Sequence, residues 1–536
     1  MGGLWCWPKP DAMRPMTVLR IALFLVLWVA SAQAATIFHR GGIGEPDSLD
    51  PHLTTTGYAG NIITDMFIGL TTIDAKAKLM PGAAESWTVS ADGKVYTFKM
   101  RAGAQWSDGH PVTAGDFEYS FRRMLDPKTA ARGAPMFYMI ENARDVQEGK
   151  KPVAALGVKA LNDTTFEVRL TNPTPYFLEL IVHRCHPVPK WAIEKFGTAW
   201  TRPENIVVNG PFILKEWVPQ TRVTLMRNPK FYDAKNIALD FVEHANVEDI
   251  ASSYARYRAG DLDVATNFPP SQIDSIRATT PQELRSVEML GLEYFVFNTR
   301  KAPFNDKRVR LALALALDRQ TIAEKVMRGG EQGADSLIPP GGRDGYTPPK
   351  APWVGLPMPE RIAKAKALLA EAGYGPAKPL KFSFRYNTSD IQKRVAVAAA
   401  GMWKAVGAEV ELLNSDLNTI NASLRNGDYE AARYQWLAEY NDPSTFLYLL
   451  ETDDVGDNHA KYSNPAFDDL MHRAYATVDM AARAKLMEQA EAIALQDAPL
   501  TPVTYYVNRQ LVKPYVKGWD DNIRGLHFDR WIRIER

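Results

Sequence analysis

Alternating hydrophobic and polar positions predict β-strands in the first half of the chain. Val95 to Met100 alternates over its whole length, and Ala91-Asp92-Gly93 separates it from a shorter alternating run, Trp87 to Val89. Two such runs around an Asp-Gly turn predict a β-hairpin. Two further strands are expected at 206–208 and 212–214, on either side of the tight turn Asn209-Gly210-Pro211.

Helical spacing and capping residues predict long helices in the second half. Asn305-Asp306 precedes residues 307–328, a segment rich in Leu and Ala that ends at Gly329-Gly330. We expect one helix there, because Leu and Ala are strong helix formers and both ends are capped. Two more helices are expected over 359–372 and 390–406, and the strands between them predict an α/β arrangement.

The stretch Arg433 to Phe446 (RYQWLAEYNDPSTF) concentrates the candidate chemistry. A short strand is expected to run into a loop, where Asn441-Asp442-Pro443-Ser444 supplies turn residues. One carboxylate, Glu439, stands among three aromatic side chains: Tyr434, Trp436 and Tyr440. An acid among aromatic rings suits a cationic group, because a low local dielectric strengthens a charge-assisted hydrogen bond. The alternative, which these residues alone favour, is a core strand with Glu439 in solvent.

The N-terminal residues have the pattern of a secretory signal peptide. Basic residues precede an apolar run, Ile21 to Ala30, that is too short to span a bilayer. Ala32-Gln33-Ala34 then provides a small-x-small cleavage signal, so we expect residues 1–34 to be removed and the mature protein to be periplasmic. Residues 1–12 fit no signal-peptide n-region, which leaves two alternative translation starts: Met13 and Met16.

Composition and charge narrow the classes of protein. The 536 residues are enough for several domains, and 46% hydrophobic with 23% charged residues is typical of a soluble globular protein. A net charge of +1 without any basic run argues against a nucleic-acid partner. Cys185 is the one cysteine that remains after signal cleavage, so no intramolecular disulfide is expected.

Motifs for catalysis are missing from the mature sequence: it has no nucleophile elbow, Walker loop, HExxH helix or paired-cysteine zinc spacing. The one metal-like cluster is His183-Arg184-Cys185-His186, whose soft or borderline ligands suit a transition metal. Prolines follow at once and no further acid or histidine crowds the segment, which favours a structural role. We therefore expect no enzyme, no cofactor and no bound metal. The alternative from another class is an exported metallo-hydrolase that uses His183 and His186.

An ordered series of motifs runs along the whole mature chain. Its members are Ala83–Pro127, which contains the predicted hairpin, EPDSLDPH (45–52), LGVKALNDTTFEV (156–168), NGPF (209–212), FNTRKAPFNDKRVRLALALALDR (297–319), YNTSD (386–390) and YNDPSTFL (440–447). This series resembles bacterial extracellular solute-binding protein family 5, and within it the periplasmic oligopeptide-binding proteins of ABC importers. The order and length of the series make the resemblance specific for the family and much less specific for the ligand.

The resemblance implies a fold and a function. The expected fold is α/β, of the two-lobed periplasmic-binding-protein type (class II, cluster C), with three domains. The implied borders are 35–67, 191–290 and 508–536 for a discontinuous domain I, 68–190 for domain II and 291–507 for domain III. Such a protein is expected to act as a monomer that captures a peptide between its lobes and delivers it to an inner-membrane ABC permease. Neither nucleic-acid binding nor membrane insertion is expected.

The resemblance also implies roles for residues around Glu439. The oligopeptide-binding proteins carry an aspartate at this position, which pairs with the α-ammonium group of the ligand. Their strand backbone binds the peptide as an added β-strand. The ligand-binding residues expected here are Glu439, Trp436, Arg433, Tyr294, Tyr506, Tyr434, Gln435, Leu437, Tyr440, Asn441, Gln392 and Leu417.

The sequence departs from the family pattern where peptide carboxylates bind. The family's basic residues for peptide C-termini fall on Met327, Gln392 and Leu424, although Arg425 is adjacent, and a pocket tryptophan falls on Leu417. The family's disulfide cysteines are absent. Arg433 is the evident carboxylate partner that remains, with a structural ion pair as its alternative role. Besides a peptide, the ligand can therefore be another cationic or amine-bearing solute, or a metal complex.

Overall fold

The computed structural model describes residues 2–3, 35–42, 44–54, 56–182, 184–341, 345–454 and 456–536. The expected signal peptide, residues 1–34, lies outside the described residues apart from Gly2 and Gly3. Among the helices of the described ranges, none combines the length and the apolar character that a membrane crossing requires.

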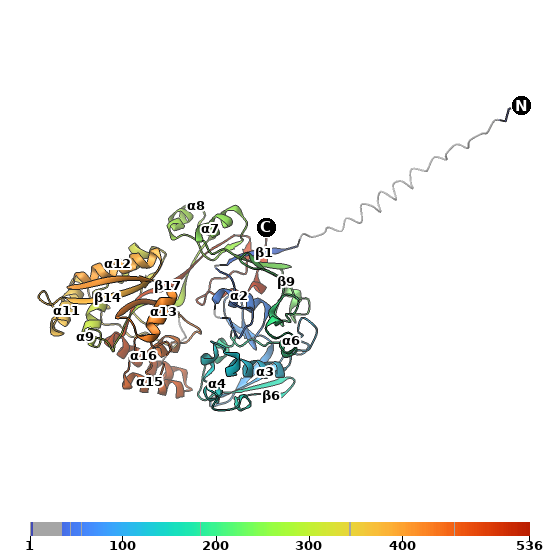
Figure 1. Cartoon of the computed structure of the whole chain (residues 1–536), viewed down its shortest axis with the longest axis horizontal. Helices are drawn as coiled ribbons and strands as arrows, with labels where there is room; N and C mark the ends of the chain where they lie inside the picture. Colours follow the sequence, from blue (N-terminus) through green and yellow to red (C-terminus); the bar gives the residue numbers. More distant parts are fainter. Residues whose placement is uncertain are drawn as a thin grey trace.

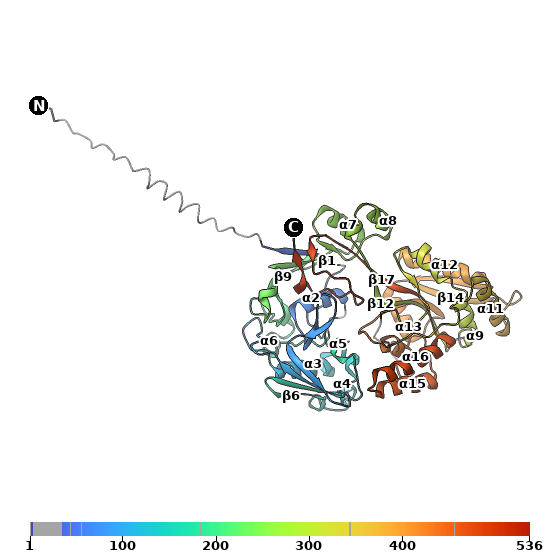
Figure 2. The same ribbon diagram turned by 180° about the vertical axis from the view of Figure 1, so that it is seen from behind.

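The chain forms two lobes joined by two long strands (Figures 1 and 2). The strands β12 (Leu284–Phe297) and β17 (Leu500–Val512) pair antiparallel and run from one lobe into the other. We call residues 35–283 with 513–536 lobe A, and residues 298–499 lobe B. One sheet continues through both lobes in the order β15-β14-β16-β12-β17-β11-β1-β10-β9-β8. The three-domain division stays a proposal within this two-lobed frame.

Lobe A contains part of the long sheet and a separate four-stranded sheet. Its share of the long sheet is β1 (Ile37–Gly42), β8 (Phe212–Val218), β9 (Arg222–Arg227), β10 (Phe241–Asn246) and β11 (Val264–Ala265). The second sheet consists of β4 (Ala84–Val89), β5 (Val95–Met100), β7 (Thr165–Arg169) and β6 (Val158–Asn162). A two-stranded sheet consists of β2 (Thr71–Ile73) and β3 (Leu79–Pro81), and another of β18 (Val516–Lys517) and β19 (Arg533–Ile534). The helices are α2 (Gly57–Met66), α3 (Ala114–Leu125), α4 (Ala143–Gln147), α5 (Phe177–Leu180), α6 (Lys190–Phe196), α7 (Ile250–Ala259) and α8 (Ile273–Thr279).

Lobe B places helices around the other end of the long sheet. Its strands are β13 (Gln332–Gly333), β14 (Leu380–Asn387), β15 (Ala408–Ser415) and β16 (Ala431–Leu437). Its helices are α9 (Lys307–Leu315), α10 (Arg319–Thr321), α11 (Met358–Glu371), α12 (Asp390–Lys404), α13 (Leu417–Asn426), α14 (Ser444–Leu447), α15 (Pro465–Ala476) and α16 (Met480–Asp497). Trp403 of α12 packs edge-on against Phe295 of β12 and Phe384 of β14, with ring centroids 5.5 and 5.2 Å apart. This aromatic core fixes the sheet that carries β16.

Several local predictions are confirmed. The pair β4–β5 forms the hairpin around Asp92-Gly93, and α11 and α12 form within one or two residues of the predicted helices. The strand expected at 206–208 is wrong. The carbonyl of Val208 instead accepts a hydrogen bond from the backbone N–H of Ser107 at 2.7 Å. The segment therefore links two parts of lobe A without joining a sheet.

The single helix expected over 307–328 is also wrong. Helix α9 ends at Leu315, because Asp318 begins a new turn, in which its side chain accepts a hydrogen bond from the backbone N–H of Thr321 at 3.0 Å. A π-helical segment, Ile322–Met327, follows.

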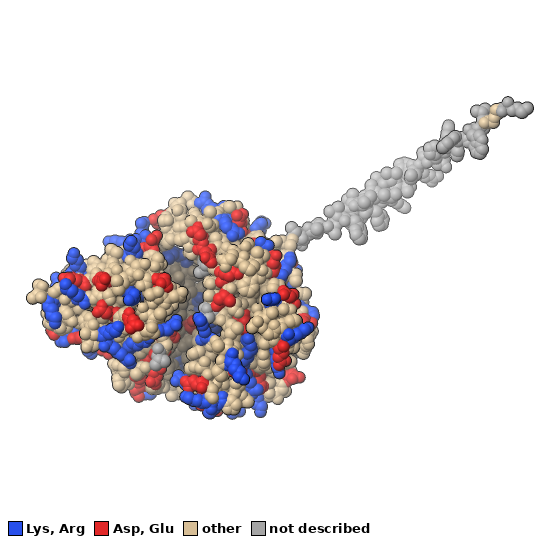
Figure 3. All heavy atoms as spheres, in the orientation of Figure 1, with Lys and Arg blue, Asp and Glu red and all other residues tan. Residues whose placement is uncertain are grey.

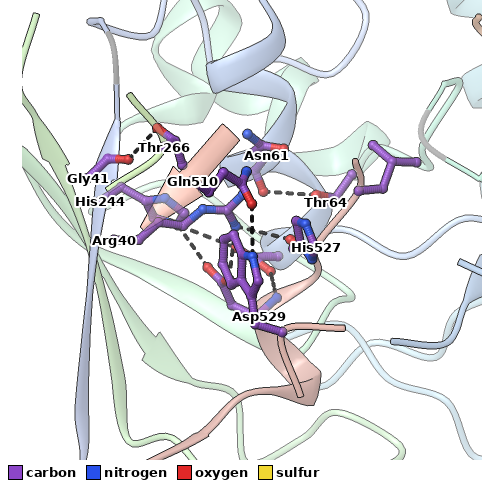
Figure 4. A network of polar contacts seen from close by, with 12 residues as sticks. Arg40, Gly41, Asn61, Thr64, His244, Thr266, Gln510, His527 and Asp529 are labelled. Atoms are coloured by element: carbon purple, nitrogen blue, oxygen red, sulfur yellow. Dashed lines mark hydrogen bonds and ion pairs between the residues drawn. The ribbon is translucent and has the colours of Figure 1, made fainter. Parts of the chain in front are cut away.

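Residues of β1 and of the C-terminal segment meet in lobe A (Figure 4). Arg40 of β1 donates from Nη1 to Asp529 Oδ1 at 2.9 Å, and the backbone N–H of Asp529 donates to Asp65 Oδ1 at 3.0 Å. His244 of β10 lies with them, its Nε2 being 3.3 Å from Asp65 Oδ2 and 3.5 Å from Asp529 Oδ2. We call Arg40, Asp65, His244 and Asp529 the terminal cluster. All four residues are buried.

Candidate ligand-binding site

A deep hollow separates the two lobes on the face shown in Figure 3. Strand β16 belongs to lobe B, and the loop that follows it, residues 438–443, reaches across to lobe A through the contacts described below. The sequence prediction centred on this strand and loop, so the expected site lies at the junction of the lobes.

One edge of β16 is open along most of its length. The strand pairs with β12 from Ala431 to Leu437, but it pairs with β14 at Ala431 and Ala432 alone in the described structure. Ala438 donates its backbone N–H to Leu290 of β12, so even-numbered residues face β12 in this antiparallel ladder. The backbone groups of the odd-numbered residues Gln435 and Leu437 therefore point to the open edge. An extended chain can add there as a further strand.

The side chains of β16 alternate between two faces. Tyr434 packs edge-on against Tyr294, with ring centroids 6.1 Å apart, and Trp436 packs edge-on against Tyr448 at 5.8 Å. Trp436 is half-buried, and its indole N–H is shielded from solvent without a hydrogen-bond acceptor among the described residues. This face thus offers an aromatic wall with one unused donor.

On the other face of β16, Arg433 is held in a buried ion pair. Its Nη2 lies 3.0 Å from Glu293 Oε2, and the two side chains are 5% and 2% exposed. Its remaining donors reach Asn387 Oδ1 at 3.0 Å and Gln435 Oε1 at 2.8 Å. The geometry favours the structural role that the sequence left open, since a ligand carboxylate would have to displace Glu293.

Leu437 and Tyr506 close over Gly291 of β12. A Cβ atom at Gly291 would lie 2.6 Å from Leu437 Cδ2 and 2.8 Å from Tyr506 Cβ, so glycine allows the two side chains to converge. This contact brings Tyr506 of β17 onto the face of β16 that Leu437 occupies.

Glu439 lies at the junction and is contacted by two arginines of lobe A. Its Oε2 is 3.2 Å from Arg184 Nη2, and its carbonyl accepts a hydrogen bond from Arg524 Nη2 at 2.9 Å. Its backbone N–H donates to Thr445 Oγ1 at 3.2 Å, which fixes the loop within lobe B. The side chain of Glu439 remains 28% exposed and is therefore accessible to solvent.

The residues after Glu439 anchor the loop in lobe A. The ring of Tyr440 stacks on Tyr176, with centroids 3.8 Å apart and planes 5° from parallel. Asn441 donates its backbone N–H to Glu179 Oε2 at 2.8 Å. Glu439, the anion expected to bind a ligand ammonium group, therefore lies on a loop that contacts both lobes.

Comparison with known proteins decides the family. The model for bacterial extracellular solute-binding proteins, family 5 Middle, matches residues 78–458. The chain belongs to this family.

Individual family 5 relatives are similar over almost the whole chain. The periplasmic oligopeptide-binding protein OppA of Salmonella typhimurium is 42% identical over 92% of this chain and 91% of its own. The probable deoxycholate-binding periplasmic protein YgiS of Escherichia coli is 40% identical over 90% of each chain. The crystal structure of Haemophilus influenzae OppA in complex with RPPGFSPFR superposes with a TM-score of 0.82, at 38% identity, over 94% of this chain and 99% of that one. These similarities confirm the two-lobed class II fold and support a periplasmic location.

Two expected residues lie apart from this constellation. Gln392 is buried in α12, with its Oε1 shielded and no donor to it among the described residues, and Leu417 begins α13 with an exposed side chain. In the described part of the chain, neither shares a hydrogen bond or ring contact with the residues around Glu439. Their role in binding stays a prediction.

Sequence reasoning missed Arg184, Arg524, Tyr176 and Glu179, all from lobe A. In the sequence, Arg184 belongs to the metal-like cluster, and none of its neighbours in the chain indicates that its partner is Glu439, 255 positions away. The other three lie in segments whose approach to loop 438–443 depends on how the lobes meet. No local pattern carries that information.

The metal-like cluster of the sequence is only partly visible, because His183 lies outside the described residues. Cys185 is buried, and burial raises the pKa of its thiol well above the usual range. His186 is also buried, which lowers the pKa of its imidazole to about 3. Both groups are thus uncharged at neutral pH.

Three members of the terminal cluster could together hold a metal ion, as judged among the described residues: Asp65, His244 and Asp529. Burial raises the pKa of Asp65 to about 6 and that of Asp529 to about 7, and lowers that of His244 to about 4. Arg40 already supplies a cation at 2.9 Å from Asp529, so a divalent ion would add charge beside a buried guanidinium. The donor set suits an internal ion pair with a surplus carboxylate better than a metal.

Proposed function

We propose that this periplasmic family 5 protein captures peptides between its lobes and delivers them to the permease of an ABC importer, without catalysis. The observation that carries the proposal is the open edge of β16 beside Glu439, at the junction of the lobes. A peptide backbone can pair with Gln435 and Leu437 there, while its ammonium group meets the carboxylate of Glu439. The relatives named OppA and the structure of one with a bound peptide support the same ligand class.

In this proposal the expected residues divide into three roles. Glu439 binds the ammonium group. The backbone of β16 binds the peptide main chain. Of the expected residues, Tyr434, Trp436 and Tyr294 line a side-chain pocket on one face of β16, where Tyr448 joins them, and Tyr506 lies with Leu437 on the other face. The protein acts as a monomer after removal of residues 1–34.

A thermal-shift screen tests this proposal. A ligand held by both lobes binds the folded closed state and not the unfolded chain, so it must raise the melting temperature. At a ligand concentration of about 100 times Kd the gain in unfolding free energy is about 2.7 kcal/mol. The screen covers di- to hexapeptides, amino acids, sugars and polyamines. Peptides are expected to give the largest shifts, and the absence of a shift with every peptide would contradict the proposal.

A second candidate ligand is an amphipathic anion, which two observations favour. The relative named as probably binding deoxycholate is nearly as similar as OppA, and Arg184 and Arg524 bring two guanidinium groups to the same site. Deoxycholate in the same screen separates the two candidates. Metal analysis of the purified protein tests the metal-complex and metallo-hydrolase alternatives, both of which require a stoichiometric metal.

A further inference from the structure

Arg184 reaches across the junction of the lobes to Glu439. The two groups form a single contact, 3.2 Å from Nη2 to Oε2, and the side chains are 33% and 28% exposed. The Nε of Arg184 is shielded from solvent and has no acceptor among the described residues. The guanidinium is therefore paired with the very carboxylate proposed for the ligand, and it has an unused donor.

A ligand that carries only an ammonium group must break this pair. When the ammonium takes Glu439, Arg184 loses its anion in a cleft that closes and excludes water. The carboxylate of Glu179 is already engaged, because it accepts from the backbone N–H of Asn441 and lies 3.8 Å from the guanidinium of the almost fully buried Arg524. An unpaired cation that loses its water is strongly unfavourable.

A ligand end with an ammonium and a carboxylate side by side leaves no charge unpaired. Its ammonium meets Glu439 while its carboxylate takes Arg184, whose planar guanidinium binds carboxylates with two parallel hydrogen bonds. Within a peptide, an N-terminal aspartate or glutamate offers both groups a few bonds apart. A neutral first residue offers only the ammonium, and a basic first residue adds a second cation beside Arg184.

We infer that Arg184 is a specificity-determining residue, which together with Glu439 selects peptides with an acidic first residue. This inference rests on the proposed function, since it assigns the ligand's amino terminus to Glu439. It also accounts for a guanidinium in a site that otherwise suits a cation.

Calorimetry with three pentapeptides that differ only in their first residue, glutamate, glutamine or lysine, tests the inference. The wild-type protein is expected to bind the glutamate peptide at least tenfold more tightly than the glutamine peptide, and the lysine peptide most weakly. In Arg184→Gln the tenfold preference should disappear, and the glutamine peptide should bind at least as tightly as to the wild type. Arg184→Lys, which keeps the charge but not the planar fork, should retain part of the preference.

Arg222→Gln is the matched control. Arg222 is similarly exposed, at 37%, and pairs with Glu216 at 3.0 Å and with Glu243 at 3.7 Å, on strands of lobe A outside the site. This variant should keep the wild-type ranking. Equal affinity of the wild type for the glutamate and glutamine peptides, or an unchanged preference in Arg184→Gln, would overturn the inference while leaving peptide binding intact. Failure of all three peptides to bind the wild type would instead overturn the proposed function, and the inference with it.

Discussion

Two arginine–glutamate pairs flank β16, and they differ in almost every physical respect. The Arg433–Glu293 pair is buried between β16 and β12, and two neighbouring side chains accept the remaining hydrogen bonds of Arg433. The Arg184–Glu439 pair joins the two lobes, is about one-third exposed and consists of a single contact. Neither member of the first pair can exchange its partner without leaving the other charge buried and unpaired. The second can exchange its partner for a ligand that offers a charge to each of its two side chains.

This difference shows where the binding energy of the site can come from. The family resemblance assigns Glu439 to a ligand ammonium group and leaves Arg433 either as a partner for a ligand carboxylate or in a structural ion pair. Burial separates them, because a fully partnered charge holds the strand in place and a half-exposed one remains accessible. The following predictions test whether the two pairs divide stability and recognition between them.

The largest expected effect is on stability, from Arg433→Met. Removing the guanidinium leaves Glu293 buried without a counter-charge, which typically costs about 3–5 kcal/mol. Urea unfolding of the variant measures the loss. Arg184→Gln, which breaks the exposed pair, should change the unfolding free energy by less than about 1 kcal/mol.

The double variant Arg433→Met with Glu293→Met is the control for this prediction. Replacing both members of a buried pair by apolar side chains of similar size is often close to neutral, so most of the lost stability should return. An equal loss in the single and double variants would show that packing, and not the unpaired charge, determines the stability of this strand.

A third pair, Arg40–Asp529 in the terminal cluster, sharpens the comparison because it has a surplus acid. The raised pKa of Asp65, about 6 against an ordinary 3.8, means that the folded state holds this proton more tightly than the unfolded state. Its contribution to stability is therefore complete below pH 3.8 and is lost as the pH rises through about 6. In Asp65→Asn this proton is absent, so the stability of the wild type relative to the variant should fall by about 1.4 kcal/mol per pH unit over that window.

Unfolding curves of both proteins at pH 4, 6 and 8 measure this difference. Comparing the two proteins at each pH removes the opposite effect of the buried histidines, which both share. A constant difference across the range would mean that folding does not raise the pKa of Asp65.

A smaller effect is expected on recognition, from Glu439→Gln. Losing the carboxylate leaves a ligand ammonium without an anion, and we expect at least a tenfold weaker affinity for free-amine peptides, or about 1.4 kcal/mol. N-acetylated peptides should lose little, since they carry no charge at that end, and Glu439→Asp should be better tolerated than Gln. Calorimetry with one peptide and its acetylated twin measures both. Equal losses for the two ligands would assign Glu439 to the loop structure instead.

The smallest effect is expected for Cys185→Ser, next to Arg184 in the chain. Cys185 is buried and its thiol is uncharged, so ligand affinity should stay within about 1 kcal/mol of the wild type. Calorimetry with the same peptide measures it. A large loss in a folded variant would revive a metal or redox role for this segment.

The sequence predicted those parts of the fold that depend on neighbouring residues. Asp92-Gly93 specifies a hairpin by its turn geometry, and the Pro and Gly residues around α11 set its ends. The helix over 307–328 was predicted too long because Asp318 competes as a cap in the middle of a strongly helical composition. Leu and Ala content alone does not reveal such a break.

The candidate site could be predicted only on its lobe B side. Glu439 and its aromatic neighbours lie within one stretch, whereas Arg184 approaches from the other lobe, and Arg433 finds its partner on β12. Contacts of this kind follow from how strands and lobes are arranged in space. Spacing along the chain therefore indicates which residues carry chemistry, but not which of them meet.

The terminal cluster has a consequence for the order of events during synthesis. Arg40 and Asp529 are 489 positions apart, so lobe A cannot complete its core until Asp529 has left the ribosome. At about 5–20 residues per second this delay lasts tens of seconds. Contacts between residues so far apart in the chain also form slowly during folding. The chain thus lacks this buried contact throughout the synthesis of the residues between Arg40 and Asp529.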